Sequence, residues 1–440
     1  MEKKDISIFS YTGSGVTWLL NFFIEIDILV YHGIDSKDVW NFNEKRQSHI
    51  LKKKEETLTV YIPTFLEKKE FVFRDNLAIK WSHEFPNCDK KNQKTILLVR
   101  DGRDTIYSQF KREKIYKNFL DMLNGVSLPL NLPYPETWAL FNYLWLKVVK
   151  KENLFIIKFA ELKTNPMPVL KELLRFIGIE RSDEEIARAI EQSSFDKAKK
   201  AEAEYRKENA NVGFTLVNRG GKIGEWRQIY NNEELNHFKN FPNEVLGTFG
   251  YEKISQEEIK PVYIEKTFFG TRKTKKKIVS DLKHANEDAV LVLGRKALCL
   301  EWLTTLQEVG NEKRAEGTEA LFAALIEACE HMPETPYLKI EIAKALGNLG
   351  AHTQALRILD GIDVALLSDA HLTERGKVYA LNCRFREARR DILRAGHHKW
   401  FTIIFREKFG KFTPRFFLRK ILPMNVRRSI RSFLTMLSPQ

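Results

Sequence analysis

The stretch from Ser10 to Trp18, called the anion loop below, reads Ser-Tyr-Thr-Gly-Ser-Gly-Val-Thr-Trp and follows a short apolar run. Its two glycines let the backbone turn tightly with several N–H groups directed inward, and the helix expected to open at Trp18 adds the positive end of its dipole. Such a loop suits a phosphate. ATP-binding loops end in Gly-Lys-Ser/Thr, whereas this one ends in Gly15-Val16-Thr17 and has no lysine. Taken alone, the stretch is equally compatible with an ordinary strand-to-helix turn.

A second candidate for anion binding lies between Thr95 and Ser108. The apolar run Thr95–Val99 delivers Arg100 to the end of a predicted strand, and the helix predicted to follow carries Ser108. A guanidinium offers a planar fork of donors and the serine adds a hydroxyl, a pair that suits a second phosphate. By itself, Arg-Asp-Gly-Arg-Asp is also typical of a solvated, charged turn.

The third candidate is the glycine-rich segment Asn218–Arg227, which places Arg219 and Lys222 beside three glycines. Backbone amides and an arginine can close on an anion together. Trp226 is expected to anchor this segment by burial.

The elements that must position these residues are those of an α/β domain. Over residues 1–255, short apolar runs alternate with longer helical stretches, which predicts a parallel sheet flanked by helices. The predicted strands are Ile6–Phe9, Ala78–Trp81, Thr95–Val99 and Leu154–Ile157. Ligands bind at the carboxyl ends of the strands in open sheets of this kind, which is where the anion loop and Arg100 lie.

In this order, the three segments resemble those of the PAPS-dependent sulfotransferases of the cytosolic type. Residues Arg219–Arg227 fit the family pattern R-x-G-x-x-G-[DE]-W-[KR] at every defined position, and the resemblance covers about residues 5–255. It implies a P-loop-type sheet and an enzyme that transfers a sulfonate group from PAPS to an acceptor hydroxyl, releasing PAP, without a metal. The acceptor could be a glycan, a glycolipid or a small molecule.

The resemblance also implies a role for individual residues. The 5′-phosphosulfate would be held by Gly13, Ser14, Gly15, Val16 and Thr17, and the adenine would be stacked on Trp18. The 3′-phosphate would be held by Arg100, Ser108, Arg219, Gly220 and Gly221. Ser193 and Phe195 resemble a segment that flanks the adenine, and Phe159 stands where a tyrosine is usual, so that its contact would be apolar.

Two residues are implied to act on the acceptor side. His83, in Lys80-Trp81-Ser82-His83, resembles the general base of the family, with one extra residue before the histidine. An imidazole with a pKa near neutrality suits the removal of a proton from an alcohol, although a lone histidine after a strand is more often structural. The family usually has a lysine or arginine where this chain has Gly13, and we expect Lys80 to replace that cation. Backbone amides alone, or weak catalysis, are the alternatives.

The C-terminal part is predicted to be helical. A basic linker over 256–280 is expected to precede an α-helical region over 281–395, in which Ala345–Ala355 and Val378–Ala388 echo each other at an offset of 33 residues. That period resembles tetratricopeptide-type helix hairpins, although a generic bundle fits as well. Such a region could bind a protein partner.

The basic tail over 396–440 carries most of the excess charge. From Lys399 onward it holds ten Lys or Arg, interleaved with aromatic and aliphatic residues, against the single acid Glu407, whereas the whole chain has a net charge of +14. This composition favours a helix lying on an anionic membrane. Packing against the helical region is the main alternative. Binding to nucleic acid is the least favoured, because no nucleic-acid module accompanies the tail.

The composition indicates the number of domains and the compartment of the protein. At 440 residues with 43% hydrophobic and 30% charged residues, the chain is typical of a globular protein of two or three domains. Its four scattered cysteines favour a reducing compartment, and the N-terminus leaves no room for a signal peptide, so we expect a cytoplasmic protein, peripheral to a membrane if the tail binds lipid. Two other functions stay open: a PAP(S)-binding adaptor with little catalysis, and an ATP-dependent P-loop kinase.

Overall fold

The computed structural model of the chain describes most of its length. Described are residues 6–32, 49–53, 56–60, 74–75, 77–113, 115–127, 130, 132–200, 221–255, 272–309, 318–332 and 334–409. These residues fall into two compact units, one comprising Met1–Phe268 with Trp302–Met332 and the other Phe269–Glu301 with Pro333–Gln440. The segment Trp302–Met332 therefore counts with the N-terminal unit, although it lies within the region predicted to be a separate helical domain.

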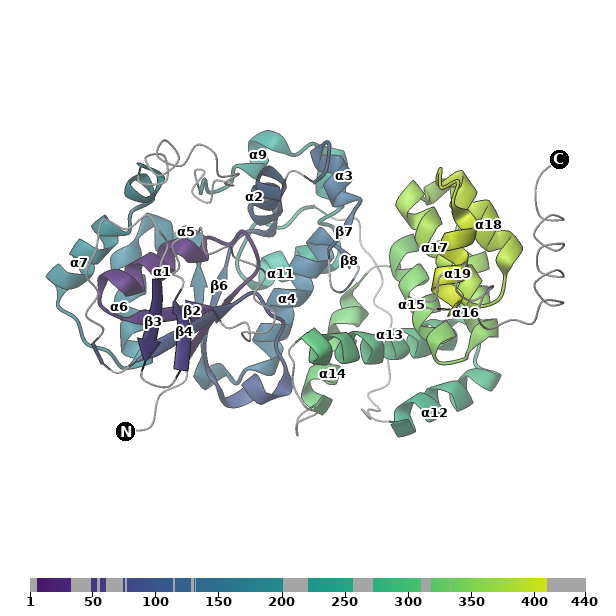
Figure 1. Cartoon of the computed structure of the whole chain (residues 1–440), viewed down its shortest axis with the longest axis horizontal. Helices are drawn as coiled ribbons and strands as arrows, with labels where there is room; N and C mark the ends of the chain where they lie inside the picture. Colours follow the sequence, from purple (N-terminus) through teal and green to yellow (C-terminus); the bar gives the residue numbers. More distant parts are fainter. Residues whose placement is uncertain are drawn as a thin grey trace. The chain divides into compact units, whose positions relative to one another are not determined.

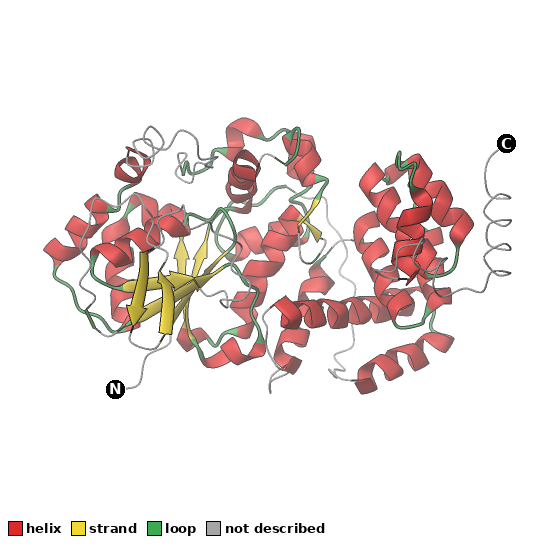
Figure 2. Ribbon diagram, in the orientation of Figure 1, coloured by secondary structure: helices red, strands yellow, loops and turns green. Residues whose placement is uncertain are grey.

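The N-terminal unit is built on a five-stranded parallel sheet with the order β2-β5-β1-β6-β9 (Figures 1 and 2). Its strands are β1 (Ile6–Ser10), β2 (Leu29–His32), β5 (Ala78–Ser82), β6 (Lys94–Val99) and β9 (Leu154–Lys158). Two short antiparallel pairs lie outside it: β3 (His49–Lys53) with β4 (Glu56–Val60), and β7 (Val126–Ser127) with β8 (Leu132–Pro133). The four predicted strands and the parallel sheet are confirmed.

Helices cover both faces of this sheet, and further helices of the unit pack outside them. They are α1 (Val16–Glu25), α2 (Gly102–Glu113), α3 (Phe119–Leu123), α4 (Tyr134–Val148), α5 (Phe159–Thr164), α6 (Pro166–Ile177), α7 (Asp183–Gln192), α9 (Trp226–Ile229), α10 (Asn232–Asn236), α11 (Phe241–Thr248) and α14 (Thr318–His331). Short 3-10 turns occur at Cys88–Asn92 and Lys151–Asn153. Helix α1 begins two residues before the predicted start at Trp18.

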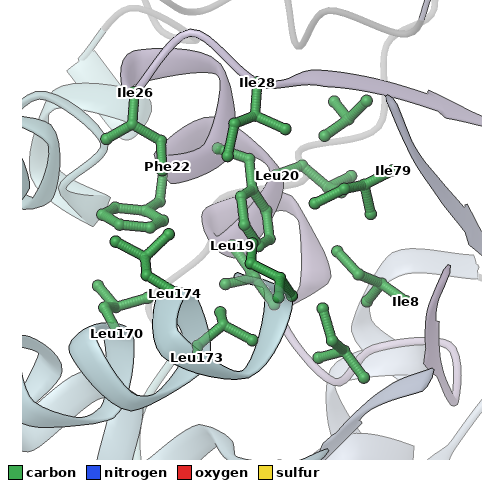
Figure 3. Packing of buried hydrophobic residues seen from close by; sticks show 14 of the residues in the cluster. Ile8, Leu19, Leu20, Phe22, Ile26, Ile28, Ile79, Leu170, Leu173 and Leu174 are labelled. Atoms are coloured by element: carbon green, nitrogen blue, oxygen red, sulfur yellow. The ribbon is translucent and has the colours of Figure 1, made fainter. Parts of the chain in front are cut away.

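Alternation along the strands sorts their side chains between the two faces. On one face, Ile8 and Ile79 pack with Leu19 and Phe22 of α1 and with Leu173 of α6 in a continuous apolar core (Figure 3). On the other face, the ring of Phe9 stacks on Trp145 of α4 at 3.8 Å between ring centroids. Both faces of the sheet are therefore buried, as expected for a parallel sheet.

The C-terminal unit is helical, as predicted, but its first helix forms at Arg272–Asp281, within the stretch predicted to be a basic linker. Its helices are α12 (Arg272–Asp281), α15 (Pro336–Asn348), α16 (His352–Asp360), α17 (Asp369–Leu381), α18 (Phe385–Arg394) and α19 (Trp400–Phe409), with 3-10 turns at Leu282–His284 and Val364–Leu366. Helix α13 (Glu287–Val309) begins in this unit and ends in the other. Among the described residues, no helix is both long and apolar enough to span a membrane.

The 33-residue offset seen in the sequence corresponds to two helix hairpins, α15–α16 and α17–α18. Their turns share an equivalent backbone hydrogen bond. Ala351 N–H donates to the carbonyl of Leu346, and Arg384 N–H donates to that of Tyr379, each at 2.9 Å. Gly350 and Cys383 occupy the same left-handed position, with φ of 84° and 63°. The predicted repeat is thus present as structure, and its membership of the tetratricopeptide class stays a prediction.

Candidate functional site

The anion loop, His83 and Arg100 follow three neighbouring strands of the sheet. The anion loop follows β1, His83 follows β5 and Arg100 follows β6, and β1 lies between the other two. In the parallel register, Phe9 is opposite Ser82 and Ser10 is opposite Leu98. The carboxyl ends of these strands therefore meet at one edge of the sheet, where ligands bind in folds of this type.

The anion loop has the backbone of an anion cradle. Gly13 and Gly15 adopt φ of 92° and 90°, and Gly15 is the N-cap residue of α1, whose first amides have no partner within the helix. Ser14 is only 1% exposed, and its hydroxyl has no hydrogen-bond partner among the described residues. A buried polar atom without a partner costs free energy unless a ligand satisfies it.

Neighbouring residues explain why both loop glycines are needed. A Cβ on Gly13 would lie 2.9 Å from the carbonyl oxygen of Thr105 in α2, and one on Gly15 would run into the ring of Phe159. Thr17 and Trp18 are half-buried on α1, with Trp18 packed partly against the apolar core. The chain therefore cannot carry the usual cation at Gly13 without moving α2 or the loop.

This geometry makes a prediction about Gly13. Introducing a lysine, one of the two residues that the resemblance implies here, by Gly13→Lys should destabilise the protein by about 1–3 kcal/mol, because the position combines a positive φ with a contact to rigid backbone. Thermal unfolding of Gly13→Lys and Gly13→Ala measures the cost. Gly250→Ala is the control, since Gly250 also has a positive φ, of 74°, but its nearest atom is the flexible end of Lys158 at 3.5 Å. If the Gly13 variants unfolded no earlier than Gly250→Ala, the contact with Thr105 would not matter.

Arg100 joins the anion loop to the glycine-rich segment. Arg100 is 5% exposed, and its guanidinium donates one hydrogen bond to the carbonyl of Gly13 and another to that of Lys222, each at 3.0 Å. It also lies 4.9 Å from the ring centre of Phe159. Burial lowers the pKa of Arg100, and the nearby carboxylates, of which Asp104 acts most strongly, oppose that shift. The result is a buried cation that holds two separate loops together.

Asp104 fixes the other end of the glycine-rich segment, a role that the sequence did not reveal. Its carboxylate accepts hydrogen bonds from the backbone N–H of Gly224 at 2.7 Å and of Trp226 at 3.0 Å. Burial raises the pKa of Asp104, while the charge of Arg100 and these two N–H groups favour the carboxylate. Trp226 is buried, as expected, and the guanidinium of Arg103 lies 3.6 Å from its ring centre.

Phe159 lies between the two loops. A Cβ on Gly221 would approach its ring to 3.1 Å and the ring of Phe195 to 3.7 Å, so the glycine-rich segment passes closely over both aromatic side chains. Ser193 is buried, and its hydroxyl donates to the carbonyl of Ala189 at 2.7 Å. The structure therefore brings together Gly13–Gly15, Arg100, Phe159, Phe195 and Gly221. Arg219 and Gly220 lie outside the described residues.

His83 lies against the start of the anion loop. Its Nδ1 is 2.6 Å from the carbonyl oxygen of Ser10. Because a carbonyl only accepts, the proton of a neutral imidazole sits on Nδ1, which leaves the lone pair on Nε2. Burial lowers the pKa of His83, with the hydrogen bond to Ser10 acting in the opposite sense. The ring is therefore held as a neutral base at neutral pH.

Lys80 lies on β5, and Ser108 lies on α2. Lys80 lies opposite Ser7 in the register of β5 and β1, and its ammonium is 3.6 Å from the carboxylate of Glu84. Ser108 lies half-buried in the second turn of α2. A cavity of about 180 Å³ adjoins Arg100 on the side of Gly224 and Tyr251.

Aromatic side chains line the neighbourhood of His83. The ring of Phe141 in α4 lies edge-on to Tyr11 at 5.8 Å and to Phe85 at 5.3 Å, and Trp145 donates its indole N–H to the carbonyl of Glu84 at 3.2 Å. These contacts hold the segment after β5 against α4. Most of residues 33–73, which follow β2, lie outside the described residues.

Comparison with known proteins identifies relatives of the N-terminal unit. The family model described as sulfotransferase domain matches residues 3–250. Sulfotransferase 2A6 of Rattus norvegicus is 22% identical over 285 residues, which cover 59% of this chain and 86% of the relative. Flavonol 3-sulfotransferase of Flaveria bidentis is 24% identical over 282 residues, which cover 56% of this chain and 83% of the relative.

Two solved structures are also similar to the chain. Mouse sulfotransferase SULT7A1 complexed with PAP is 23% identical, with a TM-score of 0.39, and the match covers 56% of this chain and 84% of that one. Retinol dehydratase in complex with androsterone and PAP is 19% identical, with a TM-score of 0.37, and the match covers 56% and 81%.

Proposed function

The chain belongs to the sulfotransferase family, and from this premise we propose that its anion loop, Arg100 and glycine-rich segment together hold PAPS, with His83 as the base that activates the acceptor. The observation that carries the proposal is the pair of hydrogen bonds by which Arg100 links Gly13 to Lys222. These bonds bring the two anion-binding segments, far apart in the sequence, to one guanidinium.

The residues present fit a nucleotide with phosphate groups at both ends. At the anion loop, the buried hydroxyl of Ser14 has no partner among the described residues, and the amides of Val16 and Thr17 at the start of α1 would face a phosphosulfate. At the other end, Arg100 and the backbone at Gly221 would take the 3′-phosphate. Phe159 and Phe195 present apolar surface to the base and ribose between them.

PAPS would supply a sulfonate group bonded to a phosphate oxygen that leaves readily. His83 Nε2 would accept the proton of the acceptor hydroxyl as that oxygen bonds to sulfur and the bond from sulfur to the phosphate oxygen breaks. The Ser10 carbonyl positions the ring for this step, because its hydrogen bond holds the proton on Nδ1. The amides of the anion loop would stabilise the negative charge that develops on the departing phosphate oxygen.

Lys80 is our proposal for the cation that Gly13 cannot provide. Its side chain lies on the face of the sheet that carries Phe9 rather than the Ile8 core, since it alternates with Ile79 and Trp81. Glu84 partly neutralises it at 3.6 Å. Donation from Lys80 to the leaving oxygen would require the ammonium to exchange Glu84 for the donor.

Radiolabelled transfer tests the enzyme against its alternatives. With PAPS labelled in the sulfonate and a mixture of sugars, glycolipids and small alcohols, label should pass to at least one hydroxyl acceptor. Binding of PAP without transfer to any of them would favour the adaptor, and label transferred from ATP instead would favour the kinase. Membership of the sulfotransferase family favours neither alternative.

We further propose that the C-terminal part attaches the cytoplasmic enzyme to an anionic membrane. The described start of the predicted tail, α19, packs against α17 and α18, as the packing alternative expects, and the tail beyond residue 409 lies outside the described residues. The membrane proposal therefore depends on α18. Arg386, Arg390 and Arg394 are exposed along one side of this helix, together with Phe385 at 42% and Leu393 at 38% exposure. Cationic and apolar side chains on one exposed face are typical of a surface that contacts anionic lipid. A protein partner for the helix hairpins is the alternative role.

Charge reversal tests this proposal. The triple variant Arg386→Glu, Arg390→Glu, Arg394→Glu of the full chain should lose at least about a hundredfold in affinity for phosphatidylserine-containing vesicles. Each basic residue near an anionic surface contributes about 1 kcal/mol, and each glutamate adds repulsion. Co-sedimentation measures the loss, with phosphatidylcholine vesicles as the control. Undiminished sedimentation of this variant, or of a chain lacking 399–440, would contradict lipid binding by the altered part.

A further inference from the structure

Lys163 in α5 is a cation of the site that none of the three sequence segments contains. Its ammonium donates a hydrogen bond to the carbonyl of Gly221 and lies 5.6 Å from the ring centre of Phe195. A Cβ on Gly221 would lie 3.6 Å from the same ammonium. Lys163 is therefore in direct contact with the glycine-rich segment at the point where Gly221 crosses Phe159 and Phe195.

Arg100 and Lys163 hold consecutive carbonyls of this segment. Arg100 binds the carbonyl of Lys222, and Lys163 binds that of Gly221. The two cations are close enough that the charge of Arg100 adds to the effect of burial in lowering the pKa of Lys163, while Asp196 acts weakly in the opposite sense. Two like charges held near each other repel, and an anion placed between them would remove that repulsion.

Phe159 keeps this arrangement apolar on one side. Its ring lies 4.9 Å from the guanidinium of Arg100. A Cβ added to Gly15 or to Gly221 would come into contact with the same ring. A tyrosine here would have added a hydroxyl donor, which phenylalanine cannot supply. The two cations thus carry more of the anion recognition at this end of the site.

We propose that Lys163 is a specificity-determining residue for the donor nucleotide, pairing with Arg100 to select nucleotides that carry a 3′-phosphate. This inference rests on the proposed function, because Gly221 is assigned there to the 3′-phosphate. In this proposal the charge of Lys163 contributes to binding of the 3′-phosphate. This role is separate from the hydrogen bond by which Lys163 supports Gly221.

The test compares two nucleotides that differ only in the 3′-phosphate. Calorimetric dissociation constants for PAP and for 5′-AMP should be measured with the wild type, Lys163→Gln, Lys163→Arg and the control Lys171→Gln, which removes an exposed lysine paired with Asp183. Lys163→Gln should weaken PAP binding about ten- to a hundredfold, as expected for one charged hydrogen bond, and change 5′-AMP binding by less than about threefold. Lys163→Arg and Lys171→Gln should keep most of the preference for PAP.

The possible results distinguish the role of Lys163 from the proposed PAPS-binding site. If Lys163→Gln weakened both nucleotides equally, Lys163 would only support the glycine-rich segment, and if it weakened neither, Lys163 would play no part in binding. Either result overturns the inference and leaves the donor site intact. A wild type that does not prefer PAP over 5′-AMP would instead refute the proposed donor site. The 5′-AMP affinity of Lys163→Gln also shows that the variant is folded.

Discussion

Replacing Arg100 with glutamine should weaken PAP binding by about a hundredfold or more. The substitution would remove the guanidinium charge that faces the 3′-phosphate, and the carbonyls of Gly13 and Lys222 would lose their common donor. A hydrogen bond to a charged group contributes about 1.5–3 kcal/mol, and each 1.4 kcal/mol is a tenfold change in affinity. Calorimetric titration of PAP measures the loss directly.

A matched control separates this effect from a general loss of positive charge. Arg74→Gln removes an arginine that is paired with Asp27 and Glu185 on the surface of the same unit, and it should leave the affinity for PAP within about threefold. The affinity of Arg100→Lys for PAP should lie between those of the wild type and of Arg100→Gln. Lysine keeps the positive charge, but it has no planar fork with which to reach both carbonyls. Wild-type affinity in Arg100→Gln would show that the nucleotide does not use this residue.

Replacing His83 with glutamine should leave PAP binding within about threefold and reduce transfer by about 10²–10⁴-fold. Glutamine keeps an amide donor for the Ser10 carbonyl, so the anion loop is preserved while the basic lone pair on Nε2 is lost. Transfer of labelled sulfonate gives the rate, and calorimetry gives the affinity. His237→Gln, at a half-buried histidine of the same unit, is the control and should transfer normally. Retained turnover in His83→Gln would assign the base to another residue.

The pH dependence of the wild type follows from the same group. Burial lowers the folded-state pKa of His83 below its ordinary value of 6.5. A base acts only when it is unprotonated, so the rate should hold as the pH falls to 6.5 and decline only below that value. A decline that begins above pH 6.5, and that is unchanged in His83→Gln, would belong to a different group.

The sheet could be predicted because its strands are short apolar runs that end at residues of clear chemistry. Ile6–Phe9 leads to the anion loop and Thr95–Val99 leads to Arg100, and in a parallel sheet strands of this type end at one edge. The hairpin repeat was predictable for a similar reason, since Gly350 and Cys383 occupy equivalent left-handed positions in turns 33 residues apart.

Asp104 and Lys163 could not be identified in the same way. Asp104 was part of a charged run that reads as a solvated turn, and its role depends on Gly224, which is 120 positions away in the chain. Lys163 was one of many lysines, and only the fold places it beside Gly221. Likewise, no local signal separates Trp302–Met332 from the helical region that surrounds it, because its assignment rests on packing against α4.

The structure also gives a physical reason for the departure at Gly13. A positive φ and the nearby carbonyl of Thr105 leave no room for a side chain there, so the loop relies on amides and on cations from elsewhere. In the proposed site, Arg100 and Lys163 both hold the glycine-rich segment, whereas Lys80 is partly neutralised by Glu84. This distribution of charge favours tight binding of the nucleotide more than strong stabilisation of the leaving group.

Calorimetric titration of the wild-type chain with PAP and with ATP, in the same buffer, is the measurement that decides the assignment most directly. A site that meets two separated phosphate ends with the anion loop and Arg100 should bind PAP at a single site per chain and bind ATP at least about a hundredfold more weakly. Equal affinity for the two nucleotides, or no heat with PAP, would contradict it.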